Sequence, residues 1–533
     1  MSFFPFDQYR PGQEEIIKSI LKSFSDNKRI VMLEAPTGSG KSVIAYTVAK
    51  HFGSSYYLTA TKILQQQLIN SFSTDKNLVA LKGRNSYTCN KWPEYIQKAA
   101  NDEISIKQAL INHLSSPEFN FNCNVGVCKM IFKKSKMPAC TPEQSTIMCP
   151  YWRQNYMARA AQICVMNFDS FLYQTVYGGK WDNRDFMVID ESHNTEDKLL
   201  DFVSLTVSDR DLGVTIKKQD TPEKYVRHFA DIDLVKHVEM LMAVAEASGD
   251  IKKYDRLESL HSKFGLLKEI SNEGWVCDYK HMVKYHVVEL KPLFVKSYAN
   301  ELILNKANRV LMMSATILSP NLVAESLGIE SNEFVFYKMP NLFPIKNRPI
   351  YVDGCGSLNF KNKIETFPKL IVKVDEICDK YNDKRGIIHT HSFEIAKLLI
   401  DSCKNSNRFL FQKNFIDKSE MLEEHSKRKN SILVAPAMHE GLDLVDGLSR
   451  FQIICKVPYP NQQDNPQLKK RVELSWHYYL WLTALKLVQS YGRSIRHKDD
   501  WAHTYIVDSD FVKFFDMAAN ILPDWFVEAL QLN

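Results

Sequence analysis

Short apolar runs alternate with longer amphipathic segments along most of the chain. Six such runs end in turn signals: RIVMLEAPTGSGKS, SSYYLTATK, DFMVIDESHN, RVLMMSATI, RGIIHTHSF and SILVAPAMHEG. Segments with helical periodicity follow them. Strands that are apolar throughout are typical of parallel sheets, which helices cover on both faces. The pattern therefore predicts an α/β fold built on parallel sheets.

Two stretches interrupt this alternation. Residues 83–153 are rich in Cys, Lys, Asn and Pro, and residues 207–299 are charged and helical in character. Strand-like runs resume after each stretch, so both are predicted to be insertions into the first α/β unit. The predicted boundaries divide that unit into residues 1–82, 154–206 and 300–340, and place a second α/β unit at residues 341–533.

The composition is that of a folded protein with several domains. A chain of 533 residues is long enough for about three or four domains, each with its own core. Hydrophobic residues make up 45% and charged residues 24%, which is ordinary for globular proteins. The sequence has neither an apolar run of the roughly 20 residues that a membrane span needs nor a secretory signal at its N-terminus. We expect a cytoplasmic, soluble protein, and the net charge of +6 weakly favours a polyanionic partner.

The segment APTGSGKS at residues 35–42 carries the strongest chemical signal, because it directly follows the apolar strand at residues 30–33. A glycine-rich turn between a strand and a helix lets successive backbone N–H groups surround phosphate oxygens. Lys41 is expected to reach the β and γ phosphates of ATP, and the Ser42 hydroxyl to hold Mg²⁺. A plain glycine turn is the alternative, and the strand–loop–helix context disfavours it.

A second signal is the acidic pair at the end of the strand MVIDESH, residues 187–193. Beside a P-loop, Asp190 can bind Mg²⁺, and Glu191 can orient and deprotonate the attacking water. An acidic pair alone is commonly a solvated strand end, and the P-loop is what makes this one specific. His193 is expected to sense the γ-phosphate or to couple the site to the DNA side, and the alternative is a surface histidine.

These motifs occur in a known order. YRPGQ lies upstream of the P-loop, LTATKILQQQL follows it, and DESH, SAT at residues 314–316, HEGLD at 439–443 and QSYGRSIR at 489–496 come later. The series resembles the superfamily two helicases over nearly the whole chain. The resemblance implies two RecA-like motor domains that share one ATPase site.

The resemblance also implies roles for single residues. Gln13 would recognise adenine, Glu440, Gly441 and Asp443 would line the nucleotide cleft, and Gln489, Arg493 and Arg496 would close it from the second motor. The expected nucleotide-binding residues are Arg10, Gln13, Thr37, Gly38, Ser39, Gly40, Lys41, Ser42, Asp443 and Gln489. The expected catalytic residues are Lys41, Asp190, Glu191, Arg493 and Arg496. Guanidinium groups suit this position because they can stabilise charge on the transferred phosphoryl group.

Cysteines are concentrated in the first insertion. Of 11 cysteines, five good ligand candidates fall there, and thiolates are soft ligands for iron–sulfur clusters or zinc. The segments KGRNSYTC at residues 82–89 and CPYW at 149–152 resemble the flanking signatures of the DinG and XPD helicases. That resemblance implies a [4Fe–4S] cluster held by Cys89, Cys123, Cys128 and Cys149. Cys140 is the alternative ligand, and zinc is the alternative metal.

The family resemblance implies an ATP-dependent DNA helicase that binds single-stranded and forked DNA, with 5′→3′ polarity. Residues 83–153 would be its iron–sulfur domain and residues 207–299 its helical arch, whose aromatic residues are expected to pack in a core. We expect a monomer, and the sequence identifies no protein partner. An RNA-directed remodeller and a nucleic-acid-binding module without unwinding remain the alternatives.

Overall fold

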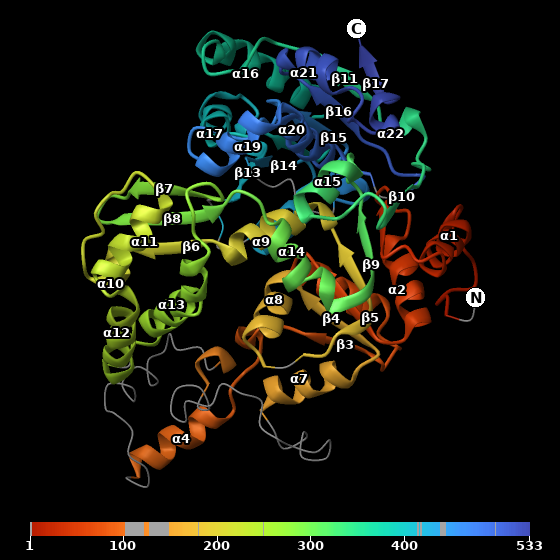
Figure 1. Ribbon diagram of the computed structural model, residues 1–533. Coiled ribbons are helices and arrows are strands. Elements are labelled where there is room, and N and C mark those ends of the chain that lie inside the picture. The colour runs from red at the N-terminus through yellow and green to blue at the C-terminus, as the bar shows by residue number, and fades with distance from the viewer. Residues whose placement is uncertain are drawn as a thin grey trace.

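The chain folds into two parallel α/β lobes and a smaller antiparallel lobe (Figure 1). The computed structural model describes residues 3–101, 122–126, 149–179, 181–248, 250–412, 415, 418–436, 444–495 and 497–532. Each α/β lobe is built on a seven-stranded sheet whose paired strands are all parallel. The predicted α/β fold with two parallel-sheet units is therefore confirmed.

The first sheet has the strand order β10-β1-β9-β5-β2-β4-β3. Its strands are β1 (Ile30–Glu34), β2 (Ser55–Thr59), β3 (Leu78–Leu81), β4 (Ile163–Asn167), β5 (Arg184–Asp190), β9 (Ala307–Ser314) and β10 (Phe334–Lys338). In register, Glu34 lies beside Ser314, and Asp190 beside Met313. Because the strands are parallel, the P-loop, the DESH segment and the SAT segment leave the same edge of the sheet.

Helices cover both faces of this sheet. The helices of the first lobe are α1 (Gln13–Ser25), α2 (Lys41–Phe52), α3 (Lys62–Ser71), α7 (Pro150–Ala160), α8 (Phe168–Val176), α9 (Thr195–Val203), α14 (Lys296–Leu302) and α15 (Pro320–Leu327). Apolar residues of α1, α2 and α3 form one core with one face of the sheet. Those of α7, α8, α9, α14 and α15 pack in the core on the other face. The helix α4 (Lys91–Ala100) lies in the cysteine-containing insertion.

The second sheet has the order β13-β14-β12-β15-β16-β11-β17. Its strands are β11 (Ile350–Val352), β12 (Gly386–His389), β13 (Phe409–Phe411), β14 (Ile432–Ala435), β15 (Phe451–Ile454), β16 (His503–Ile506) and β17 (Leu530–Leu532). Its helices are α16 (Lys363–Lys380), α17 (Phe393–Ser402), α18 (Lys418–Lys427), α19 (Pro466–Leu474), α20 (Trp476–Tyr491), α21 (Asp510–Ala518) and α22 (Asp524–Val527). The helix α20 has most of its length buried, and it leads directly into the predicted arginine motif.

The second insertion is more than a set of helices. It contains α10 (Asp209–Leu212), α11 (Pro222–Asp231), α12 (Leu234–Ser248) and α13 (Ile251–His261). These pack against a three-stranded antiparallel sheet of order β6-β8-β7, formed by β6 (Leu205–Ser208), β7 (Trp275–His281) and β8 (His286–Pro292). Tyr225, Phe229 and Trp275 are buried in its core, as their predicted packing role requires.

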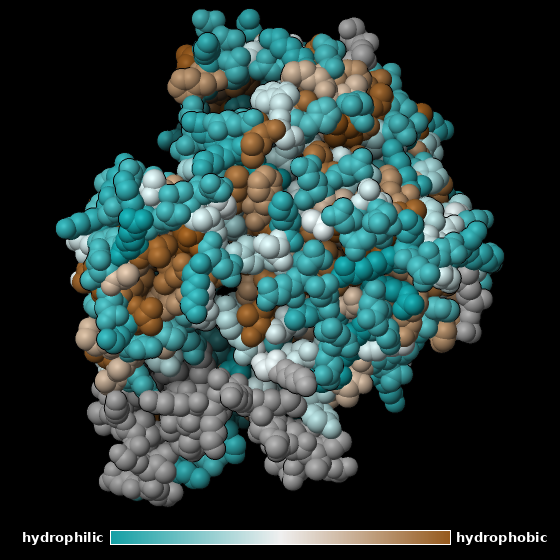
Figure 2. All heavy atoms as spheres, in the orientation of Figure 1, coloured by the Kyte–Doolittle hydropathy of each residue, from teal (hydrophilic) through white to brown (hydrophobic). Residues whose placement is uncertain are grey.

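The two α/β lobes share a continuous apolar core. Residues of α9, α14 and α15 from the first lobe and of α20 and α21 from the second belong to one buried cluster. Hydrophilic side chains dominate the visible face of both lobes, whereas hydrophobic ones gather over the antiparallel lobe (Figure 2). None of the helices in the described part of the chain has the length and apolarity needed to cross a bilayer.

Candidate nucleotide cleft and cysteine site

The P-loop has the backbone geometry that phosphate binding requires. Gly38 and Gly40 have φ angles of 81° and 86°, in the left-handed region that glycine adopts readily. A Cβ atom at Gly40 would lie 2.1 Å from the Gln13 side chain. Conformation and space therefore both favour glycine at residue 40. The Lys41 ammonium donates a hydrogen bond to the Ala35 carbonyl at 3.0 Å, so it lies folded over the loop.

Arg10 and Gln13, at the start of α1, support this loop. Gln13 is buried and donates a hydrogen bond to the Ser39 carbonyl at 3.0 Å, while its own oxygen accepts from the Arg10 backbone N–H at 2.8 Å. The Arg10 guanidinium donates to the Gly38 carbonyl. The structure thus brings Arg10 and Gln13 against the P-loop.

The acidic pair lies at the end of β5, where Asp190 is buried and the Glu191 side chain is partly exposed. Burial and the neighbouring Glu191 raise the pKa of Asp190 to about 7, against the opposing effect of Lys41. Glu191 has a φ of 52°, an uncommon conformation for a residue other than glycine. Its backbone N–H donates to the Asp190 carboxylate at 3.0 Å. A buried carboxylate that one lysine compensates only in part fits a site for a divalent cation.

The DESH and SAT segments are linked by side-chain hydrogen bonds. His193 Nδ1 and the Ser314 hydroxyl lie 2.7 Å apart, and Ser314 Oγ lies 3.4 Å from Glu191 Oε2. The Gln489 amide of the second lobe donates to the Thr316 hydroxyl at 3.4 Å. His193 therefore lies within the motif network, and Ser314 and Thr316 connect the DESH segment to the second lobe.

A cavity between the two lobes brings several of these residues together. It is lined by the P-loop residues Thr37 and Lys41, by Glu191 and His193, and by residues of the second lobe that include Gln489 and Arg493. The predicted site residues Asp443 and Arg496 lie outside the described residues, as do Glu440 and Gly441.

Three of the predicted cluster ligands converge in the first insertion. An antiparallel bridge pairs Thr88 with Asn122, and the Cys123 N–H donates to the Tyr87 carbonyl at 2.7 Å. This pairing places Cys89 beside Cys123, and both are buried. Hydrogen bonds with Cys149 and Cys89 raise the pKa of the Cys123 thiol well above its usual range.

Cys149 caps the N-terminus of α7, where its sulfur accepts a hydrogen bond from the Trp152 N–H at 3.4 Å. The Cys123 thiol and backbone N–H groups of this helix lower the pKa of Cys149 to about 7, despite its burial. Three convergent thiols fit a soft-metal site as a donor set. Cys128 and Cys140, the candidates for a fourth ligand, lie outside the described residues.

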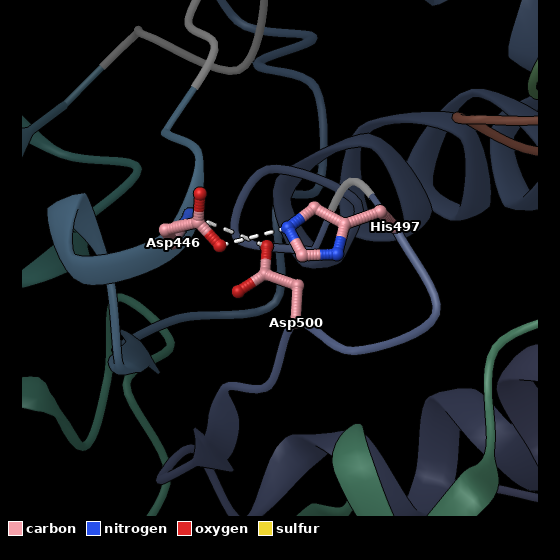
Figure 3. Close-up of side chains that lie close together, drawn as sticks. All are labelled: Asp446, His497 and Asp500. Carbon is pink, nitrogen blue, oxygen red and sulfur yellow. Dashed lines mark hydrogen bonds and ion pairs between the residues drawn. The ribbon is translucent and has the colours of Figure 1, made fainter.

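A second polar cluster lies beside the arginine motif. Among the described residues, Asp446, His497 and Asp500 form the group with potential metal ligands all within 4.8 Å (Figure 3). His497 lies 2.7 Å from Asp446, and Arg450 already forms an ion pair with Asp500 at 2.6 Å. Since Arg450 balances the Asp500 charge, the cluster suits a hydrogen-bonded link between the loops after β14 and α20.

Sequence reasoning identified SAT as a motif but assigned its residues no role. The structure places Ser314 and Thr316 between the two halves of the cleft. Their small hydroxyl side chains at the end of a buried strand were the available signal. No local sequence signal pointed to the contact between Thr316 and Gln489, because these two residues are 173 positions apart.

Comparison with known proteins agrees with this geometry. Residues 7–218 match the family described as type III restriction enzyme, res subunit, and residues 375–529 match the helicase C-terminal domain family. A relative, ATP-dependent DNA helicase CHL1 of Candida albicans, is 32% identical over 128 residues. That match covers 20% of this chain and only 15% of the CHL1 protein.

Solved XPD structures share the whole fold. The structure titled XPD helicase has a TM-score of 0.67 at 14% identity, covering 99% of this chain and 100% of the other. Apo XPD gives 0.62 at 14% identity, covering 97% of this chain and 100% of the other. The Xpd4 structure of S. tokodaii has a TM-score of 0.57 at 13% identity, covering 98% of this chain and 100% of the other.

A P-loop and an acidic strand end that face Arg493 of the second lobe are the parts of a P-loop ATPase site, and the match of the second lobe to the helicase C-terminal domain family is consistent with a helicase-type motor. The order of the motifs resembles that of the DinG/XPD-like helicases, and the fold is shared with the solved XPD structures.

Proposed function

We propose that this protein is an ATP-dependent DNA helicase that translocates on single-stranded DNA in the 5′→3′ direction and unwinds forked duplexes. One observation carries the proposal: the P-loop, the DESH segment, the end of α20 and the following Arg493 line one cavity between two motor lobes. DNA as the substrate is supported by the likeness to the DNA helicase CHL1, and the polarity by the DinG/XPD resemblance.

The proposed chemistry divides between the two lobes. Lys41 holds the β and γ phosphates, and Ser42 and Asp190 are the residues that would hold Mg²⁺, which neutralises phosphate charge when bound. Glu191 orients the attacking water and takes its proton. Arg493, together with Arg496, stabilises the charge that develops on the transferred phosphoryl group, so hydrolysis requires the lobes to close.

The insertions have distinct proposed roles. Cys89, Cys123 and Cys149, with Cys128 or Cys140, would hold a [4Fe–4S] cluster, whose thiolate ligation would cross-link residues 83–153. Residues 207–299 would form the arch that encloses the translocating strand. The first motor would comprise residues 1–82, 154–206 and 300–340, and the second motor residues 341–533.

Strand displacement on partial duplexes tests this function. The wild-type protein should separate DNA with a 5′ overhang in the presence of ATP and Mg²⁺, and should leave DNA with only a 3′ overhang intact. Lys41→Ala should abolish hydrolysis while retaining DNA binding, because Lys41 serves the phosphates. Lys22→Ala, an exposed lysine of α1, is the matched control and should behave as wild type.

Three outcomes would count against the proposal. Equal strand displacement on DNA with a 3′ overhang would contradict the proposed 5′→3′ polarity. Stimulation of the ATPase by RNA but not by DNA would make the protein an RNA remodeller. Full turnover in Lys41→Ala would show that the P-loop is not the ATPase site.

A further inference from the structure

A strained turn follows the SAT segment. Leu318 has a φ of 60°, in the left-handed region that residues with side chains seldom adopt. The Ser319 N–H donates to the Ile317 carbonyl at 2.7 Å, which closes a three-residue turn around Leu318. Strained backbone of this kind persists only where the surrounding structure holds it, and it is concentrated at functional sites.

One buried carboxylate holds the turn from the side of the P-loop. Glu34 Oε2 accepts hydrogen bonds from the backbone N–H groups of Ile317 and Leu318, at 2.9 and 2.7 Å. Glu34 is the last residue of β1, directly before the P-loop at Ala35, and only 2% of it is exposed. A charged side chain is costly to bury, and its hydrogen bonds to this turn offset that cost.

The second motor holds the same turn from the opposite side. The Trp481 indole N–H donates to the Ile317 carbonyl at 2.9 Å, and Trp481 is also 2% exposed. Trp481 lies on α20, the helix that carries Gln489 near its end and leads into Arg493. The backbone of Ile317 therefore contacts the strand before the P-loop through its N–H, and α20 through its carbonyl.

We propose that Glu34 and Trp481 are positioning residues that hold the Ile317–Leu318 turn between the motors, so that α20 delivers Gln489 and Arg493 to the bound nucleotide. The role rests on the proposed ATP hydrolysis in the cleft. Neither residue lines the cavity, so both act through the turn. Losing either contact should impair the closed, catalytic arrangement more than the binding of ATP to the P-loop.

Pairs of variants distinguish a positioning role of Glu34 and Trp481 from a general contribution of their side chains to packing. Glu34→Met keeps the length of the side chain but has no strong acceptor, whereas Glu34→Gln keeps a carbonyl oxygen. Trp481→Phe keeps an aromatic ring and removes the indole N–H. Trp476→Phe, on the same helix but 49% exposed, is its matched control. Each variant is measured for the turnover number (kcat), the affinity for a fluorescent ATP analogue, and the melting temperature.

Glu34→Met should lower kcat about tenfold and Trp481→Phe about fivefold, with ATP affinity changed less than about threefold. Glu34→Gln should retain most of the activity, and Trp476→Phe all of it. The Glu34→Met/Trp481→Phe double variant should lose no more than Glu34→Met alone, because both contacts act through one turn. If Glu34→Met does not fold, Trp481→Phe against Trp476→Phe decides the question.

Equal kcat values for Trp481→Phe and Trp476→Phe would overturn the positioning role. So would a loss of ATP affinity in step with kcat, which would indicate a ground-state effect. Wild-type protein without any ATPase would instead refute the proposed function, and the positioning role with it.

Discussion

At the residue scale, several side chains around the candidate cleft are held by hydrogen bonds to residues of another motif. Gln13 supports the loop through the Ser39 carbonyl, and Ser314 lies between Glu191 and His193. Preorganised groups of this kind need no rearrangement as charge develops in the transition state. Substitutions of single residues should therefore have separable effects on ATP binding and on turnover, even though the residues lie around one cleft.

Arg493 is the residue at which an effect on turnover should be easiest to distinguish from an effect on ATP binding. Arg493→Ala should lower kcat by about 100-fold or more while ATP affinity changes little, because a guanidinium of this type acts mainly on the transferred phosphoryl charge. Steady-state turnover and equilibrium binding of an ATP analogue measure the two effects. Lys498→Ala, an exposed cation in the same loop, controls for the loss of local charge. A parallel loss of binding and turnover would make Arg493 a ground-state contact instead.

At the element scale, the contacts that matter most join helices of different lobes. Glu196 on α9, three residues after the DESH histidine, forms a buried ion pair with Arg471 on α19. The Tyr478 hydroxyl of α20 donates to the same carboxylate at 3.2 Å, and the Arg471 guanidinium lies 4.0 Å from the Tyr478 ring centroid. The acidic strand end is therefore tied to the second motor through the helix that follows it.

Breaking this pair should destabilise the chain measurably. Arg471→Ala leaves the Glu196 carboxylate buried without its cation, which costs about 3–5 kcal/mol. The melting temperature should fall, and an Arg471→Met/Glu196→Leu double variant should recover much of the loss because no buried charge is left. Lys427→Ala breaks an exposed ion pair with Glu423 and should leave the melting temperature unchanged. A single variant as stable as Lys427→Ala would show that the pair does not anchor the interface.

Elements and their interfaces differ in how far sequence predicts them. The strand before the P-loop and the strand ending at Asp190 were predictable, because apolar runs that end in phosphate- and metal-binding residues have few other interpretations. The hairpin of β7 and β8 was missed, although WVCDYKH and HVVELKP are rich in aromatic and β-branched residues, because charged helical segments surround them. The Glu196–Arg471 pair spans 275 positions, and no local pattern encodes such a contact.

At the scale of the whole molecule, one motor is interrupted twice and the other is continuous. The apolar core runs from the first motor into the second, so the lobes are packed together as well as facing one another. The insertions leave the first sheet before β4 and after α9, and none of their described residues lines the nucleotide cavity. Unwinding and hydrolysis should therefore respond differently to damage in the cysteine insertion.

That difference can be tested through the metal. Protein purified without oxygen should contain about four irons per chain and absorb near ~400 nm through thiolate-to-iron charge transfer. Cys89→Ser and Cys149→Ser should lose iron and strand displacement together, and retain most of the DNA-stimulated ATPase. Cys277→Ser, in the antiparallel lobe, is the matched control and should keep its iron.

The fourth ligand can be found by the same measurement. The structure groups Cys89, Cys123 and Cys149. Because a [4Fe–4S] cluster is held by four thiolates, one further cysteine is needed. Either Cys128→Ser or Cys140→Ser should bleach the protein while the other retains its colour and iron. If both variants keep a full complement of iron, a four-thiolate site is wrong. A colourless wild-type protein with one tightly bound zinc and intact unwinding would replace the cluster with a structural zinc site, and the ATPase assignment would stand because its residues come from other segments.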